Sequence, residues 1–295
     1  MKTIALELVP PELDGGVQRA VEEGQKVARV ADETGLTGAI RHVMIPGMIA
    51  EEDDRPVELK PRMDVLDFWQ GFRPEVPGMR GLCTQVTAFH DKAQLTERFN
   101  ALRDSGMDGI AFVGVPRTMN DGDGPGMAPT DALAAFTDVV PNRGAILIPT
   151  RDGEQGRFNF KCEQGATYGM TQLLFSDAIV EFLTDFAKRT SHRPDVLLSF
   201  GFVPGVETKV GLIDWLIQDP GNQAVKEEQE FVARLAESSF GDKKRQLVDL
   251  YKRVIDGVGD LGFEISIHLE APYGVSKPAF ETFAEMLDYY SPVSF

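Results

Sequence analysis

The stretch Gly165–Asp177 reads GATYGMTQLLFSD. Its short apolar run follows a glycine and ends before Ser176-Asp177, a pair suited to cap a helix, so it predicts a buried parallel strand that leads into a helix. One uncharged amide, Gln172, falls toward the carboxyl end of that strand. Ligands of parallel α/β folds bind at this end, so we expect Gln172 to meet a flat heterocycle with its donors and acceptor. A core amide with satisfied hydrogen bonds is the alternative.

Strand-like and helix-like patterns alternate along the rest of the chain. Besides the stretch above, strands are expected at residues 3–8, 39–45, 81–88, 109–115, 144–149, 196–203 and 263–269. Helices are expected at residues 17–31, 64–72, 93–104, 130–139, 158–163, 178–188, 212–217, 225–237, 243–258 and 278–289. Eight strands separated by helices predict an α/β fold, the (β/α)8 TIM barrel, with residues 1–295 forming a single catalytic domain.

Composition narrows the class of partner. The formal net charge of -16 would repel nucleic acid and anionic membranes, so we expect neither. Cys83 and Cys162 are too few for a disulfide framework and lack metal-site spacing, which predicts buried free thiols. No apolar run approaches the ~18 residues of a membrane span and no signal peptide is recognised, so a cytoplasmic protein is expected.

Three ionisable residues are expected inside the barrel at its catalytic end. In residues 3–8 the apolar side chains alternate with Glu7, so if the apolar face packs on helices, the Glu7 carboxylate points into the barrel. The same alternation puts His268 and Glu270 on the interior face of the last strand, beside the first strand once the barrel closes. Desolvation raises the pKa of such a carboxyl, which can then act as a general acid near neutral pH. A structural hydrogen-bonding role is the alternative for His268 and Glu270.

Basic residues near the predicted strand-to-helix loops could supply local positive potential for a dinucleotide or a polyglutamate tail. They are Arg41, Arg117, Arg151, Arg157 and Lys161. The four histidines lie on different elements, and the first strand lacks the His-x-His pair of metal-dependent barrel hydrolases. No metal site is therefore expected.

Three motifs, in matching order and spacing over the whole chain, resemble those of the methylenetetrahydrofolate reductase family. Leu6–Pro11 reads LELVPP and resembles the family's Phe-Glu-Phe-Phe-Pro-Pro signature. The stretch around Gln172 resembles the family's Gly-Ala-x-x-x-x-Thr-Gln-x-x-Phe strand, and Pro204-Gly205-Val206 resembles its Pro-Gly-Ile segment.

The resemblance implies reduction of 5,10-methylenetetrahydrofolate to 5-methyltetrahydrofolate, a step of one-carbon metabolism that supplies methionine biosynthesis. It implies that Glu7 protonates the folate and helps open its methylene bridge to a 5-iminium cation, which then accepts a hydride. Gln172 would hold the pterin ring. Trp215 falls near a family aromatic residue that packs on the ligand rings, with core packing as the alternative. We therefore predict Gln172, Trp215, His268 and Glu270 as substrate-binding residues.

The chain departs from the family pattern where the usual members contact flavin. They carry Leu-Arg-Gly-Asp at the end of the fourth strand, whereas this chain has Phe112–Val115, and its segment after the fifth strand is shorter. Unsatisfied polar groups on a flavin would cost about 1 to 3 kcal/mol each. The resemblance thus favours the family's flavin-free branch, in which NADH or NADPH passes its hydride directly to the folate and no FAD is bound. We predict Arg117 and Arg151 as dinucleotide-binding residues. A flavin-dependent reductase and a non-catalytic folate- or nucleotide-binding barrel are the alternatives.

Overall fold

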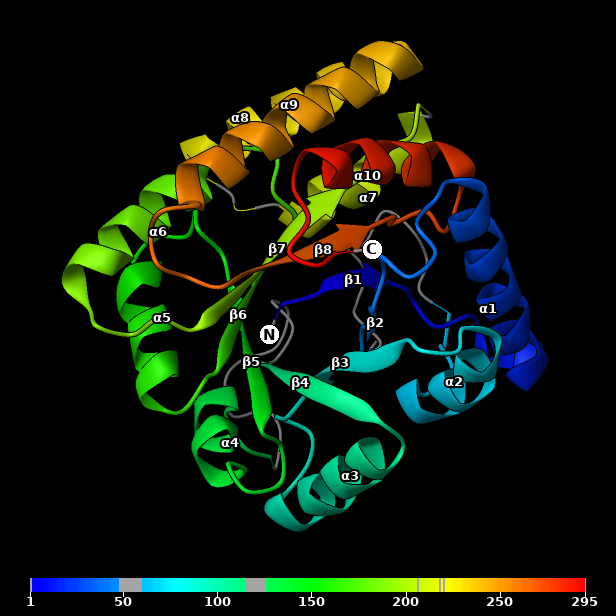
Figure 1. Cartoon of the computed structure of the whole chain (residues 1–295). Helices are drawn as coiled ribbons and strands as arrows, with labels where there is room; N and C mark the ends of the chain where they lie inside the picture. Colours follow the sequence, from blue (N-terminus) through cyan, green and yellow to red (C-terminus); the bar gives the residue numbers. More distant parts are fainter. Residues whose placement is uncertain are drawn as a thin grey trace.

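The first and last strands of the chain pair with each other, and this pairing closes the sheet. In the computed structural model, which describes residues 2–47, 60–114, 126–205, 207–217, 219 and 221–294, β1 lies parallel to both β2 and β8. The strands follow one another around the closed barrel in chain order, and Figure 1 shows the helices arranged around it. The (β/α)8 TIM barrel predicted from the sequence is confirmed.

Each expected strand and helix is present, and most bounds agree with the sequence pattern to within a few residues. The strands are β1 (Ile4–Glu7), β2 (His42–Ile45), β3 (Arg80–Val86), β4 (Met107–Val113), β5 (Asn142–Leu147), β6 (Tyr168–Thr171), β7 (Asp195–Gly201) and β8 (Ile265–Glu270). The helices are α1 (Gly16–Glu33), α2 (Val65–Phe72), α3 (Lys92–Asp104), α4 (Pro129–Ala135), α5 (Glu154–Glu163), α6 (Ala178–Arg189), α7 (Glu207–Ile217), α8 (Gln223–Glu237), α9 (Phe240–Val258) and α10 (Lys277–Tyr289), with short 3-10 helices η1 (Leu13–Gly15) and η2 (Arg73–Glu75).

Several local predictions were wrong in detail. Helix α4 ends at Ala135 and not at residue 139, and helix α7 begins at Glu207 and not at residue 212. Gln172 is the first residue after β6 and not part of the strand. Helix α5 begins at Glu154 and not at Phe158, because the Glu154 carboxylate is buried among cations and helps form the first turn instead of lying in a surface loop. Asp177 occupies the position before α6, but its side chain makes no capping bond, and the amide of Ala178 donates to Ser176 Oγ at 3.4 Å.

Strand alternation separates the buried side chains into two layers. Outward-facing residues such as Ile4 and Leu6 belong to the large apolar layer between the barrel and its helices. Inward-facing residues form a second cluster, which fills the barrel interior and leaves polar side chains at its carboxyl end. This inner cluster consists of Ala5, Met44, Leu82, Ala111, Tyr168, Met170 and Leu197.

Both cysteines are free and buried, as predicted. Burial raises the pKa of the Cys83 and Cys162 thiols to about 12 in each case, because a thiolate would be poorly solvated there. No helix among the described residues combines the length and the apolarity that a membrane span requires.

Replacing Gly169 with alanine is expected to lower the free energy of unfolding by about 1 to 3 kcal/mol, the usual cost of overpacking. A methyl group there would lie 2.6 Å from the Phe158 ring, which is fully buried between β6 and the helix layer. Urea unfolding measures the change. Gly156→Ala on α5 is the matched control, since nothing lies within 4 Å of the added methyl group, and a helical alanine is expected to be neutral or stabilising. Equal stability of the two variants would contradict the packing.

Candidate functional site

Barrel closure brings Glu7, His268 and Glu270 together, as predicted. Ala5 of β1 pairs with His268 of β8, and Ala5 belongs to the inner cluster. Glu7 stands two residues beyond Ala5, so it faces the interior at the carboxyl end of β1. Glu270 stands two residues beyond His268 and faces the same space. Figure 1 shows β1 and β8 side by side at the closure of the barrel.

His268 lies between the two carboxyl groups. Its Nε2 atom is 3.7 Å from Glu7 Oε2, and its Nδ1 atom is 3.3 Å from Glu270 Oε1. The His268 side chain is 1% exposed, against 20% for Glu7 and 11% for Glu270. The imidazole is thus sealed inside the barrel, and Glu7 is the member of the cluster most open to solvent.

Ser199 of β7 connects this cluster to β6. Its hydroxyl donates to the carbonyl oxygen of Thr171 at 2.9 Å, and its Oγ atom is 2.8 Å from His268 Nδ1. The amide of Ser199 also donates to Thr171 Oγ1 at 2.9 Å. Sequence analysis missed Ser199, although its place as an inward-facing polar residue on the predicted seventh strand was a usable signal.

Burial perturbs all three ionisable groups. Loss of solvation raises the pKa of Glu7 to about 7 and raises the pKa of Glu270 well above its usual range. Repulsion from Glu7 adds to the effect on Glu270, whereas a hydrogen bond from Ser199 opposes it. Burial lowers the pKa of His268 to about 3, so its imidazole is neutral at physiological pH. The cluster can therefore hold a proton on a carboxyl group near pH 7, which is what a general acid requires.

A cleft of about 310 Å³ opens at Glu7. The residues that follow β1 and β8 form its walls, including Leu8, Pro11 and Pro272, and Arg62 and Phe68 line it as well. A small molecule can therefore approach the Glu7 carboxyl group from the carboxyl end of the barrel.

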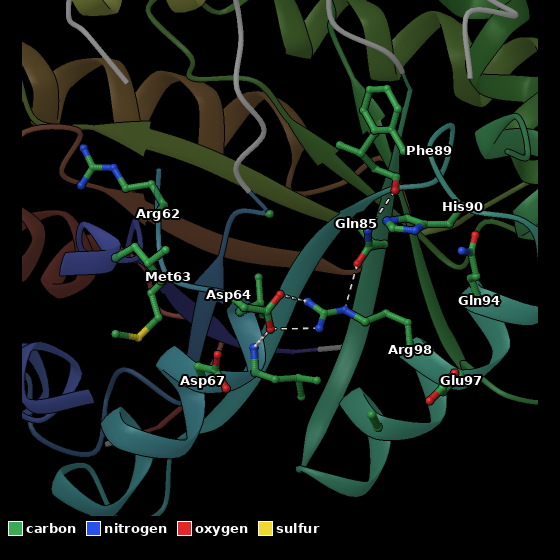
Figure 2. Close-up of a pocket in the computed structure, with 16 residues that line it drawn as sticks. Arg62, Met63, Asp64, Asp67, Gln85, Phe89, His90, Gln94, Glu97 and Arg98 are labelled. Carbon is green, nitrogen blue, oxygen red and sulfur yellow. Dashed lines mark hydrogen bonds and ion pairs between the residues drawn. The ribbon is translucent and has the colours of Figure 1, made fainter. Parts of the chain in front are cut away.

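A larger cavity of about 660 Å³ lies beside α2 and α3 and does not include Glu7. Figure 2 shows three of its polar residues bonded to one another: Asp64 accepts hydrogen bonds of 2.9 and 2.7 Å from Arg98, and the Arg98 Nε atom donates to Gln85 at 3.3 Å. Arg62 lines both cavities. Because Arg98 is engaged on all sides drawn here, the smaller cleft with its perturbed carboxyl group is the better candidate for chemistry.

Gln172 follows β6 directly and does not line the cleft at Glu7. Its side-chain amide donates a hydrogen bond to the carbonyl oxygen of Leu216 on α7. Trp215, half-buried, precedes Leu216 on the same helix. The Tyr273 phenol, in the loop after β8, is hydrogen-bonded to the backbone of Ile213 on α7. Helix α7 therefore also contacts that loop. Gln172 therefore lies close to Trp215, because it bonds to the next residue of the same helix. Helix α7 contacts both the residue after β6 and the loop after β8.

Of the predicted dinucleotide-binding residues, Arg117 lies outside the described residues. Arg151 follows β5 at the carboxyl end of the barrel, where it is half-exposed and 3.8 Å from Glu154. Glu154, 1% exposed, also pairs with Arg157 at 3.4 Å and Lys161 at 3.0 Å. Three cations thus share one buried carboxylate. Arg41 was wrongly expected at this end; it precedes β2 at the opposite end, where it donates to the Ser294 carbonyl oxygen at 2.8 Å.

The carboxylate oxygens of Glu7 and Glu270 and a nitrogen of His268 lie within 4.8 Å of one another, a spacing that a metal ion could bridge. Binding a cation would require both carboxyl groups to be ionised and His268 to supply a lone pair. Burial opposes ionisation of both carboxyl groups, so the chemistry of this cluster fits a proton better than a metal ion.

A closed (β/α)8 barrel that gathers two carboxyl groups and an imidazole at the carboxyl end of its strands has the site of a TIM-barrel enzyme. The sequence matches the family model described as mycobacterial methylenetetrahydrofolate reductase over residues 1–294. The chain therefore belongs to that family of folate-related oxidoreductases. The family resemblance predicted from the motifs is confirmed.

Two solved structures show the same fold. An uncharacterized protein from Clostridium thermocellum, described as binding two copies of 5-methyl-5,6,7,8-tetrahydrofolic acid, has a TM-score of 0.70 at 15% identity, covering 98% of this chain and 96% of that chain. Apo-MsnO8 has a TM-score of 0.55 at 11% identity and covers 98% of both chains. A comparison with curated protein sequences found no match.

The stability of Glu7→Gln relative to the natural chain is expected to increase with pH. The quantity compared is the free energy of unfolding of the two proteins. Because burial raises the pKa of Glu7 from 4.5 to about 7, its contribution to stability is complete below about pH 4.5 and is lost as the pH rises through about 7. The amide does not titrate, so the difference between the two proteins should grow by about 2 to 3 kcal/mol between pH 4.5 and 8.5. Urea unfolding across this range measures it.

The surface variant Glu285→Gln, which removes an exposed ion pair with Lys244, serves as the control for that titration. Its difference from the natural chain should stay nearly constant with pH. A Glu7→Gln difference that is equally flat would mean that Glu7 is not buried as a titrating acid.

Proposed function

We propose that this protein reduces 5,10-methylenetetrahydrofolate to 5-methyltetrahydrofolate with a hydride taken directly from NADH or NADPH, without flavin. The observation that carries the proposal is the buried Glu7 carboxyl group, whose pKa is raised to about 7 at the cleft, in a chain of this family. A structural neighbour described as binding 5-methyltetrahydrofolic acid supports a folate ligand.

Glu7 is the proposed general acid. Its proton passes to the folate nitrogen that leaves the methylene carbon, so the Glu7 O–H bond breaks, an N–H bond forms and the methylene bridge opens to a 5-iminium cation. A hydride from the reduced nicotinamide then completes the methyl group. A group with a pKa near 7 suits this role, since it is substantially protonated at neutral pH yet gives up its proton readily. Neutral His268 places no positive charge beside it that would favour early ionisation.

Gln172 and Trp215 are the proposed binding residues for the pterin ring. The Gln172 amide already donates to the Leu216 carbonyl group of α7, which leaves its oxygen and its second N–H for a ligand. Trp215 on the same helix offers a flat apolar surface for ring stacking. His268 and Glu270 act on the substrate through Glu7, since His268 is sealed inside the barrel.

The proposed route needs a nicotinamide site rather than a flavin site. Among the described residues at the end of β4, Phe112 is buried and stacks on Phe99 with ring centroids 5.1 Å apart, so no charged side chain is offered to a flavin there. Arg151, which follows β5 and is 41% exposed, is the proposed partner of the dinucleotide pyrophosphate.

Glu7→Gln is expected to lower kcat/KM for methylenetetrahydrofolate by about 10²- to 10⁴-fold, because the amide cannot donate the required proton. Affinity for 5-methyltetrahydrofolate, measured by calorimetry, should change only a few-fold. Glu285→Gln should retain full activity as the control. Natural protein that binds the folate but shows no turnover under anaerobic conditions would support a non-catalytic barrel instead.

The purified protein is expected to show no visible flavin spectrum and to give intersecting initial-velocity lines, as a ternary complex requires. With nicotinamide deuterated at C4, the label should appear in the methyl group of the product without exchange with solvent. A stoichiometric flavin together with parallel lines would instead indicate the flavin-dependent, ping-pong route.

A further inference from the structure

We propose that Arg62 binds a carboxylate of the folate's glutamate tail, so that the aminobenzoyl part of the ligand extends from the cleft at Glu7 across Val9. This inference rests on the proposed function, because it takes a folate as the ligand. It goes beyond that function by assigning a residue that recognises the end of the ligand farthest from the reacting carbon.

The backbone holds Arg62 at the carboxyl end of the barrel. Arg62 lies just before α2 and forms a β-bridge with Glu12, which follows β1. Two backbone hydrogen bonds of 2.9 Å flank this bridge, one donated by Leu13 and one by Met63. The bridge places Arg62 in the wall of the cleft at Glu7 and in the wall of the cavity of about 660 Å³. Its side chain therefore borders both spaces.

The guanidinium group of Arg62 has no acidic partner within the described part of the chain. Its one hydrogen bond there is long, 3.4 Å from Nη1 to the carbonyl oxygen of Pro10, and its Nε atom is buried without a partner. Figure 2 shows Arg62 apart from the paired Asp64 and Arg98. A buried N–H group without an acceptor is costly, and the donor fork of arginine matches the two oxygens of a carboxylate. The side chain therefore suits an anionic group of a ligand.

The other cations around the cleft at Glu7 are already paired. Arg19, which also lines the cleft, pairs with Glu22 at 3.2 Å, and Lys60 pairs with Glu12 at 3.3 Å. Among the described residues, Arg62 is thus the cation of this cleft that is left for a ligand. The acidic side chains of the cleft are Glu7, Glu12, Asp14 and Glu23. Because they repel an anion elsewhere in the cleft, a ligand carboxylate is favoured beside Arg62.

Exposed apolar side chains border the same two spaces. Val9 lines the cleft at Glu7 and is 39% exposed, and Leu13 lines the larger cavity and is 59% exposed. Ligand pockets span about 300 to 1,000 Å³, so a cleft of about 310 Å³ suits a pterin ring better than a whole folate. An aromatic ring that leaves the cleft across Val9 would cover apolar surface, which is favourable. The carboxylate beyond that ring is then within the space that Arg62 borders.

Calorimetry on the full-length protein tests the contact. The probes are 5-methyltetrahydrofolate and its glutamate diamide, in which neutral carboxamides replace both carboxylates. The natural protein should bind the acid about 10- to 100-fold more tightly than the diamide, as expected for a charge-assisted pair. In Arg62→Gln the two ligands should bind within a few-fold of each other. Equal binding of both ligands by the natural protein would overturn the proposal whether or not any variant folds.

Arg19→Gln is the matched control. It removes one positive charge from the same cleft, but from an exposed side chain that is paired with Glu22, so the preference for the acid should persist. Arg62→Lys keeps the charge without the planar fork and should keep only part of the preference. A loss in Arg19→Gln as large as that in Arg62→Gln would mean that the net charge of the cleft recognises the tail, which contradicts the assignment to Arg62.

Steady-state kinetics separates this inference from the proposed function. In Arg62→Gln the KM for methylenetetrahydrofolate should rise about 10- to 100-fold with kcat unchanged, because a contact with the tail is equally strong in the ground state and the transition state. Protein that binds the acid with the expected preference but shows no turnover would refute the proposed function and leave the role of Arg62 intact. Turnover with an unchanged KM in Arg62→Gln would do the reverse. Failure to bind either folate ligand would refute both.

Discussion

The pairing of β1 with β8 is the constraint on which the site depends. These strands come from opposite ends of the chain, and no local signal connects them. Once Ala5 and His268 are neighbours in the sheet, the next inward positions bring Glu7 and Glu270 into one largely buried space. Two carboxyl groups cannot both ionise cheaply there. The closure of the barrel therefore raises the pKa values of Glu7 and Glu270, because the contact that completes the sheet also removes these carboxyl groups from most of the solvent.

The buried carboxyl groups of this protein differ in the neighbours that offset their loss of solvation. Glu154 is surrounded by three cations and serves as a structural anchor for the loop after β5. Within the described part of the chain, no lysine or arginine pairs with Glu7 or Glu270, whose neighbours are a neutral imidazole and a hydroxyl group. An ion pair would have lowered their pKa values and left ordinary carboxylates. Burial without a neutralising cation is what allows one of them to keep a proton at pH 7.

The motifs that resemble the family and the segments that depart from it lie on opposite sides of the barrel. The matched motifs lie on β1, after β6 and after β7, on the side where the acid cluster and α7 are found. The departures lie on β4 and the loop after β5, on the opposite side of the barrel, where Phe112 turns into the helix layer and Arg151 joins a cationic cluster. This division agrees with the proposed folate site on one side of the barrel and the proposed nicotinamide site on the other, which the experiments separate.

Much of this could be predicted from the sequence, because period-two and helical patterns directly reflect which side chains are buried. The patterns determined the strand order, the inward direction of Glu7, His268 and Glu270, and the burial of both thiols. The sequence did not reveal the role of Ser199, the cations around Glu154 or the attachment of Gln172 to α7, since each depends on residues that are distant in the chain. Only tertiary structure decides which groups surround His268, because Glu7, Ser199 and Glu270 reach it from three strands that lie side by side.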